Sequence, residues 1–156
     1  MRAELINTAR ELREKAEKLA YLQDDGEYSY IDKYKEITSW IYKTCRELIR
    51  FKGENDEEEA EICLAVLIGY STTIRDSKNI RRAIDRAYQV LPLLAPSLLK
   101  CQLLIYCYIE ACDGSLIREA KQIIDSWGGK DIGEEETKTK ELFENLEKYK
   151  EDIFVD

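Results

Sequence analysis

The stretch SLLKCQLLIYCYI, residues 97–109, is the segment that decides the fold class of this chain. Its second half, residues 103–109, consists of seven consecutive apolar or aromatic residues. A helix that is apolar on all its faces must be covered by other elements on more than one side. We therefore predict that this segment is a helix at the centre of a helical core.

The rest of the chain divides into segments with the apolar spacing of amphipathic helices, in which apolar positions recur every three or four residues. These segments cover residues 3–22, 31–52, 55–74, 80–91 and 116–127, and a last one begins at residue 134. Every glycine except Gly69 falls between two of the segments. Gly69 lies inside one, where we predict the close approach of another helix. The sequence therefore predicts an all-α fold, a single compact multi-helix bundle of about seven helices.

The charge distribution changes near the C-terminus. A chain of 156 residues fits one domain by length. Residues 131–156 hold ten acidic residues and four lysines, so they carry −6 of the total net charge of −8. We predict a helical core domain over residues 1–129 and an acidic C-terminal helix and tail over residues 130–156. The sequence leaves open whether this last helix docks or detaches.

The overall composition argues against several classes of function. With 24 basic and 32 acidic residues, the chain lacks the excess positive charge of most nucleic-acid-binding domains, so direct nucleic-acid binding is disfavoured. There is no histidine, and the five cysteines form no C-x-x-C pair, so no zinc site of the usual spacing is expected. We also find no phosphate-binding glycine loop and no nucleophile elbow. We predict no cofactor, no metal and no enzymatic activity.

The cysteines and the N-terminus indicate the compartment. All five cysteines fall within helical patterns, and we predict that all five are small core residues, as a free cysteine usually is. An odd number of cysteines without a signal sequence fits a reducing environment. No apolar run approaches the length of a membrane span. We predict a cytoplasmic protein without membrane segments.

Two clusters are candidates for binding a partner. The first is aromatic and consists of Tyr28, Tyr30 and Tyr34, at the start of the predicted second helix. Such a cluster favours a recognition surface, but it is also typical of packing residues whose hydroxyl groups reach water. Both interpretations stay open.

The second cluster is the most basic segment of the chain. Its cations are Arg75, Lys78, Arg81, Arg82 and Arg86. One interpretation is an ordinary solvated helix face. The other is a surface that docks an acidic protein or a phosphate backbone.

Three long segments resemble the UpxZ family of transcription antitermination inhibitors. They are EEEAEICLAVLIGYSTTIRD (57–76), LPLLAPSLLKCQLLIYCYIE (91–110) and REAKQIIDSW (118–127), with a looser match at YSYIDKY (28–34). The resemblance covers residues 5–128 and leaves the acidic tail outside. Where the family pattern reads GYNATIYD, this chain reads GYSTTIRD, so Arg75 replaces an aromatic residue.

The resemblance implies a cytoplasmic regulator from bacteria that carry several capsular polysaccharide loci. Such proteins repress non-cognate loci by interfering with NusG-like antiterminators, and the RNA polymerase complex is a further expected partner. The family supplies no catalytic residues. Two alternatives stay open: a small helical nucleic-acid-binding regulator that uses the cations between residues 78 and 86, and a generic helical adaptor that binds peptides beside Tyr28 and Tyr34.

Overall fold

The computed structural model describes residues 2–25, 31–73, 75–128 and 131–154. These residues contain seven α-helices, one short 3-10 helix and no strand, so the predicted all-α class is confirmed. The elements are α1 (Arg2–Asp25), α2 (Ile31–Leu48), α3 (Asp56–Thr72), α4 (Ser77–Val90), η2 (Leu91–Leu93), α5 (Leu98–Ala111), α6 (Gly114–Ser126) and α7 (Glu134–Phe154). None of the described helices is long and apolar enough to cross a membrane.

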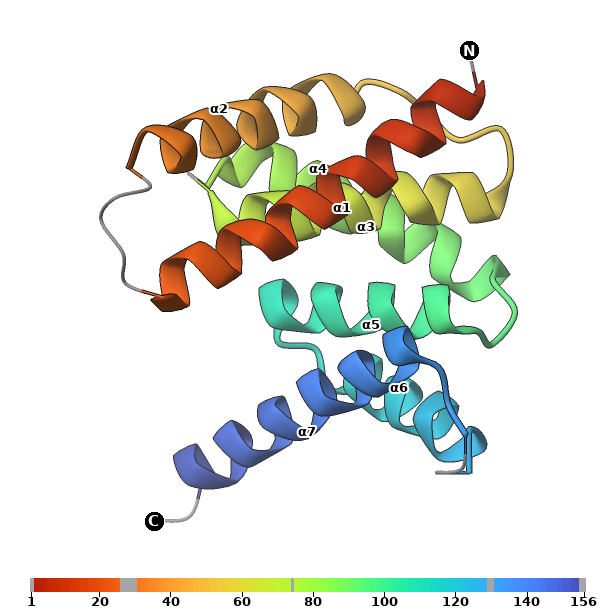
Figure 1. The fold of residues 1–156 in the computed structure, drawn as a ribbon. Helices are drawn as coiled ribbons and strands as arrows, with labels where there is room; N and C mark the ends of the chain where they lie inside the picture. The colour runs from red at the N-terminus through yellow and green to blue at the C-terminus, as the bar shows by residue number, and fades with distance from the viewer. Residues whose placement is uncertain (1, 26–30, 74, 129–130, 155–156) are drawn as a thin grey trace. The chain divides into compact units, whose positions relative to one another are not determined.

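The packing contacts divide the chain into two units, residues Met1–Leu94 and Ala95–Asp156. The N-terminal unit holds α1 to α4 and η2, and the C-terminal unit holds α5 to α7 (Figure 1). This division is based on contacts within each unit. The domain boundary predicted after residue 129 is based on the change in charge along the sequence, and it stays a prediction.

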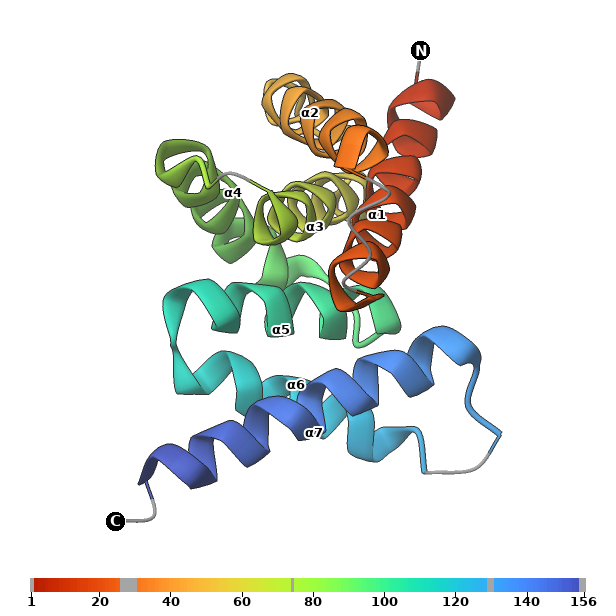
Figure 2. The same ribbon diagram turned by 60° about the vertical axis from the view of Figure 1, so that its left-hand side comes forward.

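The N-terminal unit is built around α3, which contacts α1, α2 and α4 (Figure 2). Six consecutive residues of α3, from 62 to 67, are buried, as expected for a helix covered on several sides. A Cβ atom built on Gly69 would collide with the Sγ atom of Cys45 and lie 3.3 Å from Cγ2 of Ile41. Because both of these residues belong to α2, the predicted close approach of another helix at Gly69 is confirmed.

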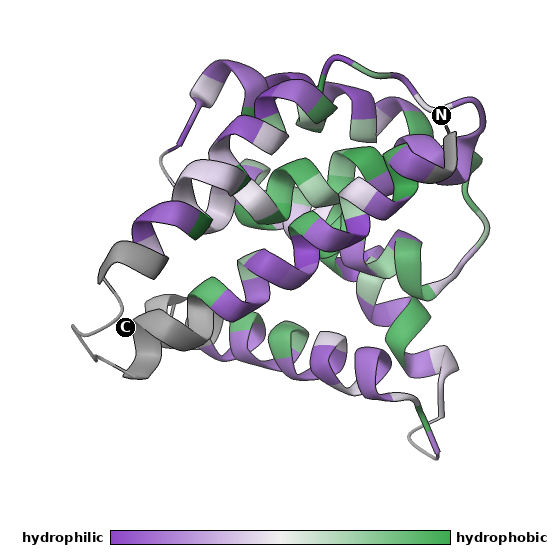
Figure 3. Ribbon diagram, turned by 45° about the horizontal axis from the view of Figure 1, so that its top comes forward, coloured by the Kyte–Doolittle hydropathy of each residue, from purple (hydrophilic) through white to green (hydrophobic). Residues whose placement is uncertain are grey.

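Side-chain caps fix the starts of α3 and α4. The backbone N–H of Glu58 donates to Oδ1 of Asn55 at 2.9 Å, and the backbone N–H of Asn79 donates to Oδ1 of Asp76 at 3.1 Å. Each bond satisfies an N–H group that has no partner within the helix. Along α4 the buried residues recur every three or four positions, as in an amphipathic helix. Purple and green residues alternate along several helices when the ribbon is coloured by hydropathy (Figure 3).

The C-terminal unit is organised by α5, which contacts both α6 and α7. Nζ of Lys100 lies 2.8 Å from a carboxylate oxygen of Glu119 on α6. Towards α7, Nε2 of Gln102 donates to Oγ1 of Thr139 at 3.4 Å. The predicted central position of this helix is therefore confirmed within its unit. Its burial stops before its end, because Ile109 is 38% exposed.

The prediction that all five cysteines are core residues is wrong for Cys112. Four cysteines are buried, whereas Cys112 is exposed and lies in the left-handed conformation with φ at 55°. It is the C-cap of α5, where the chain turns sharply towards α6. Burial raises the pKa of the Cys45 and Cys101 thiols to about 12. The pKa of Cys107 is also raised to about 12, by burial and by the nearby charge of Glu110.

Candidate functional site

The one described member of the predicted aromatic cluster lies at the start of α2, whereas the predicted basic cluster lies before and along α4. Tyr28 and Tyr30 lie outside the described residues, and Tyr34 is half-buried in the first turns of α2. Arg46, at the other end of α2, is twelve residues further along, which corresponds to roughly 18 Å at the α-helical rise of about 1.5 Å per residue. Tyr34 therefore does not share a site with the cations described below.

Four of the five predicted cations are exposed. Arg75 precedes α4, and Lys78, Arg81 and Arg82 lie in its first two turns. The fifth cation, Arg86, is placed differently.

Arg86 belongs to a hydrogen-bond network inside the N-terminal unit, so grouping it with the surface cations was wrong. Its Nε atom donates to Oε2 of Glu59 at 2.9 Å, and its Nη2 atom donates to Oε1 of the same carboxylate at 2.7 Å. The same guanidinium donates to the backbone carbonyl oxygens of Ile49 and Phe51, each at 2.6 Å. Arg86 thus joins α4 to the start of α3 and to the chain that leaves α2.

The Glu59 carboxylate is held in its charged form by this network. Its side chain is only 10% exposed, and burial by itself would raise its pKa. The hydrogen bonds from Arg86 and from the backbone N–H of Gly53, with the charge of Arg86, outweigh that effect and lower the pKa of Glu59. The hydrogen bond to Glu59 is also the main reason why the pKa of Arg86 is raised. The Arg86–Glu59 pair therefore stabilises the packing of α4 against α3 and the segment after α2.

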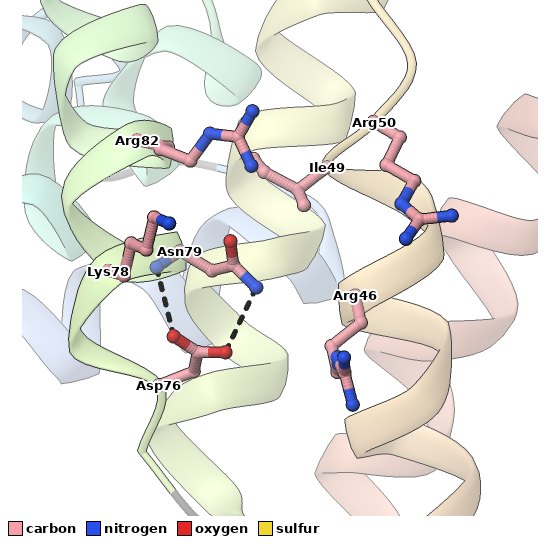
Figure 4. A pocket seen from close by; sticks show the side chains of 7 residues that line it. All are labelled: Arg46, Ile49, Arg50, Asp76, Lys78, Asn79 and Arg82. Carbon is pink, nitrogen blue, oxygen red and sulfur yellow. Dashed lines mark hydrogen bonds between the residues drawn. The ribbon is translucent and has the colours of Figure 1, made fainter.

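A basic cleft lies between the end of α2 and the start of α4 (Figure 4). Its volume is about 230 Å³. It is lined by Arg46, Ile49, Arg50, Asp76, Lys78, Asn79 and Arg82. The structure therefore brings together two predicted cations of α4 with Arg46 in the last turn of α2 and Arg50 in the turn that follows it, both of which sequence reasoning missed. We call this arrangement the basic cleft.

The carboxylate of Asp76 holds the start of α4, and it forms no ion pair with the described cations of the basic cleft. Its Oδ1 atom accepts from the backbone N–H of Asn79, and its Oδ2 atom accepts from Nδ2 of the same residue at 3.0 Å. Nδ2 of Asn79 also donates to the hydroxyl oxygen of Tyr70 at 3.1 Å. Burial is the main reason why the pKa of Tyr70 is raised to about 12. The GYSTTIRD segment thus helps to position one wall of the cleft.

The only sequence signal for Arg46 and Arg50 is their spacing of four residues, which places both on one face of a helix. Lys78 and Arg82 have the same spacing on α4. Nothing in the local sequence indicates that these two helix faces meet.

In the described part of the chain, no group of three or more cysteine, aspartate or glutamate side chains is arranged to hold a metal ion.

The comparisons with known proteins agree with the observed fold. Residues 9–109 match the model of the UpxZ family of transcription anti-terminator antagonists. The chain is also similar to the crystal structure of the transcription anti-terminator antagonist UpxZ from Bacteroides uniformis ATCC 8492, with 33% identity, a TM-score of 0.81 and coverage of 92% of each chain. No curated protein matches the chain. This chain belongs to the UpxZ family of transcription anti-terminator antagonists, a family of regulators.

Proposed function

We propose that this protein acts in the cytoplasm as a transcription regulator that inhibits NusG-like antiterminators of non-cognate capsular polysaccharide loci. It binds the antiterminator directly and blocks its contact with RNA polymerase or with the leader RNA. The result is repression of those loci without any chemical transformation.

The observation that carries the proposal is the match to the UpxZ family, which runs through the helices that form the N-terminal unit and into α5. The described residues of that unit add a preformed charged cleft on rigid helices. A cleft of this kind suits recognition of another macromolecule, because charge complementarity accelerates association and selects among partners.

Binding of purified proteins tests the proposal. This protein is titrated into labelled NusG-like antiterminators from cognate and non-cognate capsular loci of one genome. We expect Kd values at or below about 1 μM for non-cognate antiterminators, which corresponds to about −8 kcal/mol. The absence of binding to every antiterminator at that concentration would contradict the proposal.

Nucleic-acid binding is the second candidate, and the exposure of Lys78, Arg81 and Arg82 on α4 is the observation that favours it. If these cations contact phosphates, the affinity for leader RNA falls steeply as salt is raised. A gel-shift experiment at low salt tests this, and the absence of a complex there eliminates the candidate.

A further inference from the structure

We propose that the basic cleft is the docking site for a carboxylate-rich segment of the antiterminator, with Arg50 and Arg82 as its main contacts. This inference rests on the proposed function and adds to it a surface, the residues and the chemistry of the partner.

The cations of the basic cleft are not used in the ion pairs described within the N-terminal unit. Elsewhere in the N-terminal unit, Arg13 lies 3.5 Å from Glu61, Lys15 pairs with Glu11, and Arg86 binds Glu59. The four cations of the cleft form no ion pair with a described acidic side chain. The unit has 16 basic and 18 acidic residues, so this positive site lies on a unit that is slightly negative overall.

Part of this arrangement disfavours folding. Like charges four residues apart on a helix are destabilising by roughly 0.2–0.5 kcal/mol per pair, and Lys78 and Arg82 on α4 form one such pair. Lys78 lies in the first turn of α4, where the helix dipole is positive and disfavours a cation. The dipole favours Arg46 near the end of α2, so the cost is concentrated on the α4 side. The positive N-terminal end of the α4 dipole adds to the positive potential of the cleft.

The cations of the cleft match the chemistry of a carboxylate-bearing partner. Three of the four cations are arginines, whose planar guanidinium groups bind carboxylates with two parallel hydrogen bonds. The volume of about 230 Å³ lies below the range of about 300–1,000 Å³ for small-molecule sites, so a few side chains fit better than a cofactor.

The lining of the cleft favours a protein over RNA. Sequence-specific recognition of single-stranded RNA relies on aromatic side chains that stack on the bases, and the described residues that line the cleft include no aromatic side chain. The nearby Tyr42 is already engaged, because its ring lies 5.8 Å from the guanidinium of Arg46 and packs edge-to-face on Tyr70. Carboxylates of a protein partner therefore fit the site better than a phosphate backbone with stacked bases.

The test compares charge reversals inside and outside the cleft. The variants are Arg50→Glu and Arg82→Glu, and the control is Arg81→Glu, which makes the same charge change at an exposed neighbour on α4 that does not line the cleft. Each full-length variant is titrated against a purified non-cognate NusG-like antiterminator and against leader RNA. A hexaglutamate peptide serves as a competitor, and thermal unfolding verifies that each variant is folded.

We expect Arg50→Glu and Arg82→Glu to weaken antiterminator binding by at least tenfold, Arg81→Glu to change it by less than threefold, and hexaglutamate to compete. If the wild-type protein binds and all three variants bind equally well, the docking site is overturned while the proposed function stands. If the cleft variants lose only RNA binding, the occupant is a phosphate backbone and the inference is wrong. If the wild-type protein binds no antiterminator, both the proposed function and this inference fail.

Discussion

Replacement of Arg86 by methionine is the sharpest test of how the N-terminal unit is held together. Methionine keeps much of the apolar stem and removes the guanidinium, which makes two hydrogen bonds to Glu59 and one each to the carbonyl oxygens of Ile49 and Phe51. The Glu59 carboxylate then keeps only the backbone N–H of Gly53 among these partners. A charge that is largely buried would lose its counter-ion.

The magnitude follows from the burial of the pair. Breaking a buried ion pair by removing one partner costs about 3–5 kcal/mol. The side chains of Arg86 and Glu59 are 21% and 10% exposed, so some solvent screening remains and we expect the lower end, about 3 kcal/mol. For a chain of this size, that loss lowers Tm by roughly 6–12 °C.

Urea unfolding followed by tryptophan fluorescence measures the loss. The chain has two tryptophans, Trp40 in the N-terminal unit and Trp127 in the C-terminal unit. In a Trp127→Phe background, the fluorescence reports only on the unit that contains Arg86. The control is Arg82→Met, the same substitution one turn earlier on α4, at an exposed side chain without a described ion pair.

We expect Arg82→Met to change the free energy of unfolding by less than about 0.5 kcal/mol, as is usual at exposed positions. A double-mutant cycle with Glu59→Gln then isolates the coupling between Arg86 and Glu59, expected at about 1–3 kcal/mol. The structural role assigned to Arg86 is refuted if Arg86→Met and Arg82→Met destabilise the unit equally.

Three further predictions concern packing, acid stability and thiol reactivity. Gly69→Ala forces a methyl group against Cys45 and should destabilise the N-terminal unit by about 1–3 kcal/mol in urea unfolding; an unchanged midpoint contradicts the packing described. The pKa of Glu59 is lower in the folded than in the unfolded chain, so the ionised Glu59 carboxylate stabilises the fold fully above the unfolded pKa of about 4.3. This contribution to the free energy of unfolding is lost as pH falls through the folded pKa. Unfolding measured from pH 6 to 2 should therefore show less pH dependence in Glu59→Gln than in the wild type. Cys112 should react with a thiol reagent at pH 8 well before the four buried cysteines, and mass spectrometry showing several thiols modified together would disprove this.

The helices could be predicted from the sequence because their signals are local. Apolar spacing and cap residues depend on neighbours a few residues away, as Asn55 and Asp76 show at the starts of α3 and α4. The close approach of α2 at Gly69 could also be predicted, because an isolated glycine within a helical pattern often marks such a contact. The predicted second helix ran too far, to residue 52, whereas α2 ends at Leu48. There, Arg86 binds the carbonyl oxygens of residues 49 and 51 from a distant part of the chain.

The basic cleft and the Arg86 network could not be predicted, because both depend on which helix faces meet. Arg86 and Glu59 are 27 residues apart, and periodicity alone places Arg86 among the solvated cations of α4. Arg46 and Arg50 looked like ordinary surface cations, since the sequence does not state that the end of α2 lies beside the start of α4. The family resemblance was carried by core-type residues, which identify a fold and do not locate a partner surface.

We propose above that this protein regulates transcription by occupying the surface of an antiterminator. An in vitro elongation assay tests it most directly, with purified RNA polymerase, a capsular leader template and a panel of NusG-like antiterminators. We predict that this protein abolishes antiterminator-dependent read-through for non-cognate antiterminators and leaves elongation by polymerase alone unchanged. Read-through that stays unchanged with every antiterminator, at protein concentrations well above 1 μM, would contradict the claim.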